Sequence, residues 1–362
     1  MGKRHYIIPI FVPHEGCPHD CAFCNQARIT GEETEEAVKG PKFKFENGVN
    51  AKFVRDTVEE YLETIQMEKD TTLEISFFGG TFTAVDITKQ RRLLSVAKEY
   101  KEKGTIDYIR LSTRPDYIDK DILDHLKSFN VDIIELGVQS LDEEVLIKST
   151  RGHTAGQVEV ASKLIKDYGF TLGHQIMLGL PSDTRERDIE TTKKSIAMKP
   201  EICRIYPTLT IKDTAMEYMY NNGLYTPYTL DECVDIAKEC YKLFIDANVN
   251  VIRVGLQATD NITAGEDVIA GPFHPAFREL VESSILNDKI FEIVTKQKEV
   301  KNIRIEISNR SVSKLYSDKK RYFKDMISKT KINNISVKVI NDFKSNYLNL
   351  YLDGILFEVE II

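Results

Sequence analysis

The chain has 362 residues, a net charge of −7, 42% hydrophobic and 29% charged residues, a balance that excludes disordered, collagen-like and fibrous proteins. No apolar run approaches the roughly 18 residues that cross a bilayer, and the apolar stretch at the N-terminus is too short for a signal peptide. We therefore predict a cytoplasmic protein without membrane contact. Six cysteines are too few for a disulfide scaffold in a chain of this length.

Short apolar runs alternate with segments of helical spacing along most of the chain. The predicted strands cover 6–12, 73–78, 106–111, 131–138, 170–178, 202–206 and 249–256, and the predicted helices cover 52–67, 88–100, 119–128, 154–168, 184–197 and 230–248. This alternation is typical of a parallel sheet. About six βα units precede residue 210, fewer than the eight of a closed barrel. We predict an α/β fold built on a partial (β/α)6 TIM-like barrel.

The character of the sequence changes after about residue 290. The segment 296–331 has twelve Lys or Arg and four Asp or Glu, a net charge of +8, so the rest of the chain carries −15. Strand-like runs follow at 335–340, 347–351 and 355–362, and Asp353-Gly354 between the last two is typical of a hairpin. We predict a barrel domain over 1–288 and a small basic α+β domain over 289–362.

Three cysteines lie on the loop at 14–30 that follows the first predicted strand. Cys17, Cys21 and Cys24 have the spacing Cys-x3-Cys-x2-Cys. Three thiolates on one loop suit an iron–sulfur cluster, with one iron of a four-iron cluster left open. The alternative is zinc, with His14 or His19 as the fourth ligand. The position after a barrel strand, at the mouth where barrel chemistry occurs, favours the cluster.

The other three cysteines, Cys203, Cys233 and Cys240, are expected to pack in the core. Cys203 lies within an apolar strand, and the other two share one helix face. Buried free cysteine behaves as a small hydrophobic residue.

Several motifs in order carry a family resemblance. They are Phe-Phe-Gly-Gly-Thr at 77–81, Ser-Thr-Arg-Pro-Asp at 112–116, Glu-Leu-Gly-Val-Gln-Ser at 135–140, Thr-Arg-Gly-His-Thr at 150–154 and Arg-Ile-Tyr-Pro-Thr-Leu at 204–209. With the cysteine loop, they resemble the radical S-adenosylmethionine (SAM) superfamily. From about residue 5 to 285 their order resembles the catalytic subunit of Elongator. Anaerobic coproporphyrinogen oxidase and its relatives form the nearest competing subfamily.

The resemblance implies a radical SAM barrel in which the open iron of a 4Fe-4S cluster binds SAM. Reductive cleavage of SAM then releases a 5′-deoxyadenosyl radical. It implies the metal ligands Cys17, Cys21 and Cys24. It places the following residues at SAM: Phe23, Gly79, Gly80, Thr81, Ser112, Gln139, Arg151 and Gln175. Among these, Gln139 and Arg151 are expected to be catalytic, and the planar donor fork of Arg151 suits the SAM carboxylate.

Other polar residues follow later strands and are predicted to face the substrate. They are Arg114, Asp116, Tyr206, Thr208, Arg253 and Gln257. Phe23 could equally fill the end of the barrel, and His174 could equally pack on the outer side of the sheet.

The resemblance covers the radical SAM half of the Elongator subunit only. That family carries a C-terminal acetyltransferase domain, whereas here Gly354 is the only glycine after Gly271, which leaves no glycine-rich loop to hold acetyl-CoA. We predict a radical SAM enzyme that modifies tRNA or another RNA. The alternatives are a radical SAM enzyme for a small molecule and a zinc-stabilised binding module without radical activity.

Two partners follow from this prediction. One is an electron donor such as flavodoxin or ferredoxin. The other is tRNA, bound through the densest basic residues, which are Lys314, Lys319, Lys320, Arg321 and Lys324.

Overall fold

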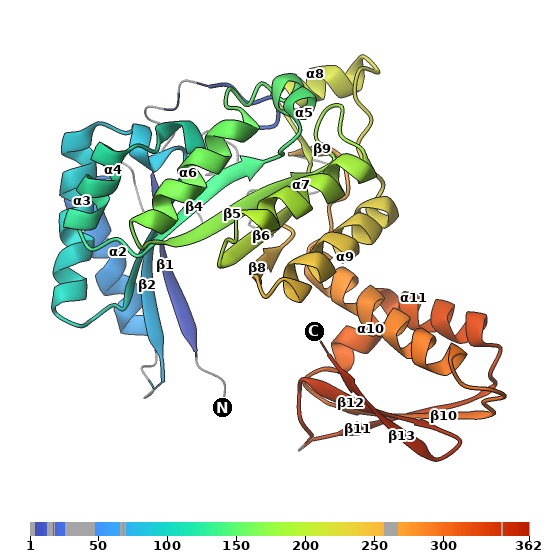
Figure 1. Ribbon diagram of the computed structural model, residues 1–362. Helices are drawn as coiled ribbons and strands as arrows, with labels where there is room; N and C mark the ends of the chain where they lie inside the picture. The colour runs from blue at the N-terminus through green and yellow to red at the C-terminus, as the bar shows by residue number, and fades with distance from the viewer. Residues whose placement is uncertain are drawn as a thin grey trace.

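Seven parallel strands form the main sheet of the protein. The computed structural model describes residues 4–12, 17, 19–25, 48–65, 68, 70–256, 267–341 and 343–361. The strands pair in the order β1-β2-β3-β4-β5-β6-β8. They are β1 (His5–Val12), β2 (Thr72–Gly79), β3 (Tyr108–Thr113), β4 (Ile133–Gln139), β5 (Thr171–Leu178), β6 (Ile202–Pro207) and β8 (Asn250–Val254). The sheet curls into an open half-barrel, which confirms the predicted α/β partial barrel (Figure 1).

Helices between the strands cover the outer side of this sheet (Figure 1). They are α2 (Ala51–Thr64), α3 (Ile87–Glu102), α4 (Lys120–Ser128), α6 (Ala155–Asp167), α7 (Arg185–Ala197) and α9 (Leu230–Asp246). Each begins after a short polar side chain that accepts a hydrogen bond from the first turn, as Asp86 does for α3 and Thr184 for α7. The helix starts are therefore encoded locally, as the sequence patterns predicted.

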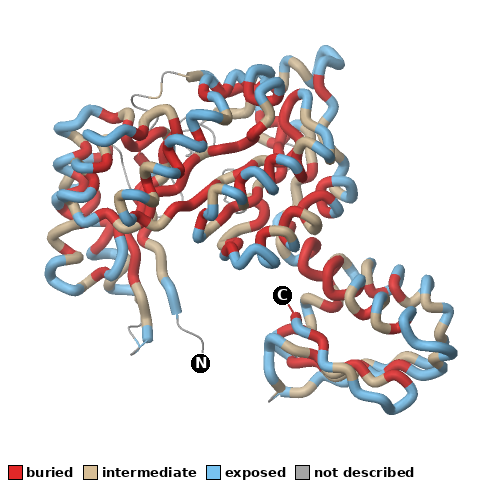
Figure 2. The backbone as a smooth tube through the Cα atoms, viewed as in Figure 1, coloured by how far each residue is buried: buried red, intermediate tan, exposed pale blue. Residues whose placement is uncertain are grey.

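The main apolar core lies between the sheet and these helices. Alternate strand residues such as Ile75 and Leu111 point outward into it, so the strands are mostly buried (Figure 2). Cys203, Cys233 and Cys240 are fully buried in the same core, and burial raises the pKa of all three thiols, to about 12 for Cys240. Their predicted packing role is confirmed.

Shorter elements gather beyond the carboxyl ends of the strands. They are the 3-10 helices η1 (Phe82–Ala84) and η2 (Pro115–Tyr117), the helices α5 (Glu143–Lys148) and α8 (Ala215–Asn221), and the antiparallel pair β7 (Thr210–Ile211) and β9 (Val268–Ala270). Within the described ranges, no helix is both long and apolar enough to cross a membrane.

The C-terminal part has a sheet and a core of its own. Its elements are α10 (Phe277–Thr295), β10 (Asn302–Ser308), α11 (Val312–Thr330), β11 (Asn334–Ile340), β12 (Tyr347–Leu352) and β13 (Ile355–Glu360). The strand order is β11-β10-β12-β13, and β12 pairs antiparallel with β13 around Asp353-Gly354, as predicted for a hairpin. Residue 288 lies inside the continuous helix α10, and the division of the chain at this point stays a prediction.

Candidate functional site

The cysteine loop lies at the carboxyl ends of the barrel strands and is held there by backbone hydrogen bonds. The Ala22 N–H donates to the Ser149 carbonyl after α5 at 2.9 Å, and the Met216 N–H of α8 donates to the Ala22 carbonyl at 2.9 Å. The loop is therefore fixed between two elements that are far from it in sequence. Phe23 packs with Met216 and Tyr225 in a small apolar cluster, which is the space-filling role left open by the sequence.

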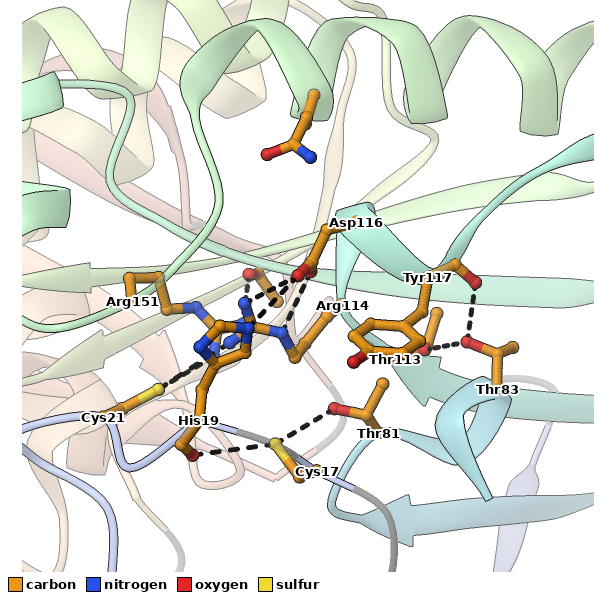
Figure 3. Close-up of polar contacts among 12 residues, drawn as sticks. Cys17, His19, Cys21, Thr81, Thr83, Thr113, Arg114, Asp116, Tyr117 and Arg151 are labelled. Carbon is orange, nitrogen blue, oxygen red and sulfur yellow. Dashed lines mark hydrogen bonds and ion pairs between the residues drawn. The ribbon is translucent and has the colours of Figure 1, made fainter. Parts of the chain in front are cut away.

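Side chains from three different turns, after β2, β3 and α5, meet the cysteine sulfurs (Figure 3). Thr81, after β2, donates to Cys17 Sγ at 3.5 Å. Two guanidinium groups approach Cys21: Arg151 Nη1 lies 3.3 Å from its sulfur, and Arg114 Nη1 lies 3.8 Å from it. Burial, together with the neighbouring Cys21, raises the pKa of Cys24 to about 12.

The residues of this site fit an anionic iron–sulfur cluster. Three thiols share one loop, and the guanidinium groups of Arg114 and Arg151 supply buried positive charge beside them. Arg151 Nε is buried without a hydrogen-bond partner. Burial, with a further contribution from these two cations, lowers the pKa of His153 to about 2, so this imidazole is neutral. In the described part of the chain, no three His, Cys, Asp or Glu side chains are grouped closely enough to hold a metal ion, and the cysteine ligands stay a prediction.

The loop histidine predicted as an alternative zinc ligand faces a carboxylate instead. His19 Nε2 lies 3.7 Å from Asp116 Oδ2, on the turn that follows β3 (Figure 3). His14 lies outside the described residues. The arrangement around His19 therefore gives the zinc alternative no support.

The glycine turn after β2 is required by the neighbouring strand. Gly79 has a φ of +115°, and a Cβ atom there would overlap the Val12 carbonyl oxygen of β1. The Gly80 N–H also donates to this oxygen at 3.4 Å. Packing against β1 thus explains Gly79 without a ligand, whereas contact of the turn with SAM stays a prediction.

Gln139, Arg151 and Gln175 converge around Gly137 of β4. Gln139 ends β4 with a φ of +65°, and Gln175 Nε2 of β5 donates to its Oε1 at 3.4 Å. Arg151 Nη2 donates to the Gly137 carbonyl at 2.6 Å. A Cβ atom on Gly137 would lie 2.6 Å from Arg151 Nη2 and 3.0 Å from Gln139 Nε2. Three of the predicted SAM contacts therefore share one place, which the sequence did not specify.

The remaining predicted residues are more scattered. Ser112 donates to Glu135 inside the barrel at 3.5 Å, and Tyr206 accepts from Arg204 at 3.4 Å. Thr208 is buried, and its hydroxyl has no partner. Arg253 lies on β8 opposite Arg204, and Gln257 lies outside the described residues.

His174 has the outer-face role that the sequence left open. Its ring nitrogens bond Ser162 of α6 at 2.9 Å and Ser195 of α7 at 2.8 Å. Burial lowers the pKa of His174 to about 3, so it is neutral in the fold.

Sequence reasoning missed a chain of buried charges on the inner face of the half-barrel. Arg110 Nη2 of β3 donates to Glu74 Oε2 of β2 at 2.8 Å, and Arg110 Nε lies 2.6 Å from Glu74 Oε1. Arg110 also pairs with Glu135 of β4. Arg204 Nε of β6 lies 3.0 and 3.1 Å from the two oxygens of Glu135. Gly173 of β5 makes room, because a Cβ atom there would lie 2.7 Å from Glu135 Cγ. The signal in the sequence that could have revealed this chain was a charged residue inside each of the apolar strands β2, β3, β4 and β6.

The fold and the site define an open α/β barrel with a three-cysteine loop at its mouth. The sequence model of the radical SAM superfamily matches residues 11–195, and that of the Radical_SAM C-terminal domain matches residues 200–287. The chain belongs to the radical SAM superfamily, whose members use a 4Fe-4S cluster and SAM.

Within the superfamily, the chain is similar to the Elongator catalytic subunit. It is 28% identical over 261 residues to the tRNA uridine(34) acetyltransferase of Methanocaldococcus jannaschii, which covers 64% of this chain and 47% of that protein. It is 34% identical over 145 residues to Elongator complex protein 3 of Homo sapiens, covering 39% of this chain and 26% of that protein. The chain thus spans about half the length of the first relative and about a quarter of the length of the second.

A solved structure shows the same fold. The Elp3 protein of Methanocaldococcus infernus, with an N-terminal deletion, superposes with a TM-score of 0.60 at 18% identity. The superposition covers 97% of this chain and 76% of that chain.

Proposed function

We propose that the protein is a radical SAM enzyme in which Cys17, Cys21 and Cys24 hold one 4Fe-4S cluster. The observation that carries this proposal is the three-thiol loop fixed at the barrel mouth beside two buried guanidinium groups. When bound, the cluster and SAM supply reductive cleavage of SAM to a 5′-deoxyadenosyl radical. We propose that the protein acts in the cytoplasm, where a reducing protein such as flavodoxin or ferredoxin supplies the electron.

In this proposal, the residues of the chain itself bind and orient the cluster and SAM. Thr81 holds Cys17, and the fork of Arg151 is fixed by the Gly137 carbonyl with its Nε free of protein partners. We propose that Arg151 and Gln139 bind the amino-acid part of SAM, because charge-assisted bonds to a carboxylate are strong. We further propose that Gly79, Gly80, Thr81, Ser112 and Gln175 contact SAM and that Phe23 covers its adenine.

We propose tRNA as the substrate. Two observations support it: the similarity to a tRNA uridine(34) acetyltransferase and the net charge of +8 over 296–331 in an acidic chain. Clustered Lys and Arg side chains bind phosphates without sequence preference. The match covers 47% of that relative, so we propose a modification of tRNA without assigning the group transferred.

Two of the five basic residues predicted to bind tRNA form ion pairs within the chain. Lys314 pairs with Glu282 of α10 at 3.0 Å, and Arg321 forms two bonds of 2.6 Å to Asp231 of α9. These two cations hold α11 to the neighbouring helices. Lys319, Lys320 and Lys324 are exposed on the same segment.

Helix α11 is also interrupted in this region. Residues 316–320 have non-helical backbone angles, and Lys320 has a φ of +67°. Lys320 and Lys324 therefore do not share one regular helix face, although they are four residues apart. Lys320 Nζ instead lies over the Tyr316 ring at 4.2 Å.

The internal pairing of Lys314 and Arg321 also favours a second candidate, a radical SAM enzyme that acts on a small molecule. If the basic segment serves mainly to attach α11, its charge gives no reason to expect RNA. The two candidates differ in whether tRNA affects turnover.

The test of the radical activity is anaerobic reconstitution with iron and sulfide, followed by SAM and dithionite, with 5′-deoxyadenosine measured by mass spectrometry. We expect about four iron atoms per chain. Substitution of any one of Cys17, Cys21 and Cys24 by Ala should abolish both iron uptake and the product. Cys203→Ala is the matched control, because that thiol is buried in the core. Stoichiometric zinc without iron would refute the proposal.

The test of the substrate compares two triple variants of equal charge. Lys319, Lys320 and Lys324 are changed to Glu in one, and the exposed Lys120, Lys193 and Lys242 of the barrel helices are changed to Glu in the other. We expect only the first to bind total tRNA more weakly, with a salt dependence reduced by roughly one unit per lost phosphate contact. Equal tRNA binding by both variants, with 5′-deoxyadenosine formation indifferent to tRNA, would favour the small-molecule candidate.

A further inference from the structure

The guanidinium group of Arg114 is oriented toward one cysteine sulfur by the carboxylate of Asp116, which is 11% exposed. Its Nε and Nη2 donate to the two oxygens of Asp116, each at 2.9 Å. This bidentate pair leaves Nη1 on the other edge of the fork, 3.8 Å from Cys21 Sγ (Figure 3). The Arg114 side chain is only 2% exposed.

Asp116 is itself fixed by its surroundings. It lies in η2, and Thr83 of η1 donates to the Tyr117 carbonyl of this turn at 2.8 Å. Asp116 Oδ2 also faces His19 of the cysteine loop at 3.7 Å. The His19 ring also packs against Gly152, where a Cβ atom would overlap it. The turn after β3 thus holds the cysteine loop at both His19 and Cys21.

This arrangement differs from the substrate-side role that the sequence predicted for Arg114 and Asp116. A buried ion pair is weak evidence for stability, because desolvation offsets most of the attraction between its charges. A pair that needs only to be stable would not direct its remaining donor to a sulfur. The geometry instead suits control of the group that Cys21 holds.

We propose that Arg114 is a positioning residue for Cys21 and that the Arg114–Asp116 pair sets the reduction potential of the cluster. The inference rests on the proposed function, since it requires Cys21 to be a cluster ligand. N–H donors and positive charge near the sulfurs of a cluster stabilise its reduced form, which carries one more electron. The carboxylate of Asp116 has the opposite electrostatic effect and also fixes the direction of the fork.

The two charges therefore predict shifts of opposite sign. Arg114→Gln removes a donor and leaves a buried negative charge, so the midpoint potential should become more negative. Asp116→Asn removes the negative charge, so the potential should become more positive. The double variant should lie between them. We expect about a tenfold change in the ratio of reduced to oxidised cluster at a fixed potential for each single variant, which is about 59 mV.

The experiment uses the reconstituted full chain without SAM. The midpoint potential is measured by a redox titration followed by electron paramagnetic resonance, and iron per chain and the melting temperature of the apoprotein are measured alongside. Arg185→Gln is the control, because Arg185 also pairs with two carboxylates, but on the outside of the barrel. Its potential should equal that of the wild type.

Opposite shifts in the two single variants support the inference. Shifts of the same sign, shifts below about twofold in the ratio at fixed potential, or loss of iron with a lower melting temperature overturn it. If Arg114→Gln takes up no iron yet melts like the wild type, the iron content of Arg114→Lys is measured next. Recovery of iron by the lysine charge supports the inference, and failure to recover overturns it. Absence of iron from the wild type would instead refute the proposed function.

Discussion

Glu135 connects two buried arginines, and its replacement should cost the fold several kilocalories per mole. Its side chain is 4% exposed, and it accepts from Arg110, from Arg204 and from Ser112. In Glu135→Gln, Arg110 keeps its ion pair with Glu74, including the hydrogen bond of 2.8 Å. Within the described part of the chain, Arg204 pairs with no second carboxylate, and it keeps only Tyr206 at 3.4 Å and the Phe78 ring at 5.2 Å.

The magnitude follows from the burial of that one guanidinium group. Burial lowers the pKa of an arginine, but the charge of Glu135 outweighs this and holds the pKa of Arg204 above its ordinary value. Removal of one partner from a buried ion pair costs about 3–5 kcal/mol. We expect Glu135→Gln to lower the free energy of unfolding by this amount, whereas Arg185→Gln, on the surface, should lower it by about 0.2–1 kcal/mol.

The assay is equilibrium unfolding in urea followed by far-ultraviolet circular dichroism, because the chain contains no tryptophan. A double-mutant cycle adds Arg204→Gln and the double variant. Since the double variant leaves no unpaired charge at this position, it should lose less than the sum of the two single losses, by at least about 1 kcal/mol. A loss below about 1 kcal/mol in Glu135→Gln, or strictly additive losses, would refute the reasoning.

Three further predictions concern the turn after β2, a buried acid pair and the SAM contacts. Gly79→Ala should lower the free energy of unfolding by at least about 2 kcal/mol, because the new Cβ atom overlaps the Val12 carbonyl at a positive φ, whereas Gly104→Ala, with φ +70° and no atom nearby, should cost only about 1–2 kcal/mol; equal losses in urea unfolding would contradict this. Burial raises the pKa of Asp183 to about 6 and, together with Asp183, raises that of Asp188, so the fold binds extra protons and loses stability as the pH rises from about 4 to about 6. Asp183→Asn should therefore melt at a higher temperature at pH 7 and show a smaller loss over this range, because Asp188 stays buried, and a pH profile parallel to that of the wild type would be evidence against it. Arg151→Ala should weaken SAM binding by about 1.5–3 kcal/mol in calorimetry with an intact cluster, and unchanged affinity would exclude the proposed contact.

Local patterns in the sequence were sufficient to predict the partial barrel. Three kinds of signal act over only a few neighbouring residues, so they can be interpreted without the fold. They are the apolar periodicity, N-cap residues such as Asp86 and Thr184, and the Asp353-Gly354 turn. The cysteine spacing was equally local. Short elements such as α5 and α8 were not predicted, because six or seven residues give too little periodicity.

The tertiary structure alone decided which side chains meet. Arg114 and Cys21 are 93 residues apart, and the contact between them depends on the turn after β3 reaching the loop after β1. The pairing of Glu135 with Arg110 and Arg204 depends on the register of four strands, β3 to β6, and on the space left by Gly173. Net charge over 296–331 was visible in the sequence, but the use of Lys314 and Arg321 as internal partners was not. Periodicity determines which face of an element is buried, whereas register and crossing geometry determine its neighbours, and those arise only when distant segments pack.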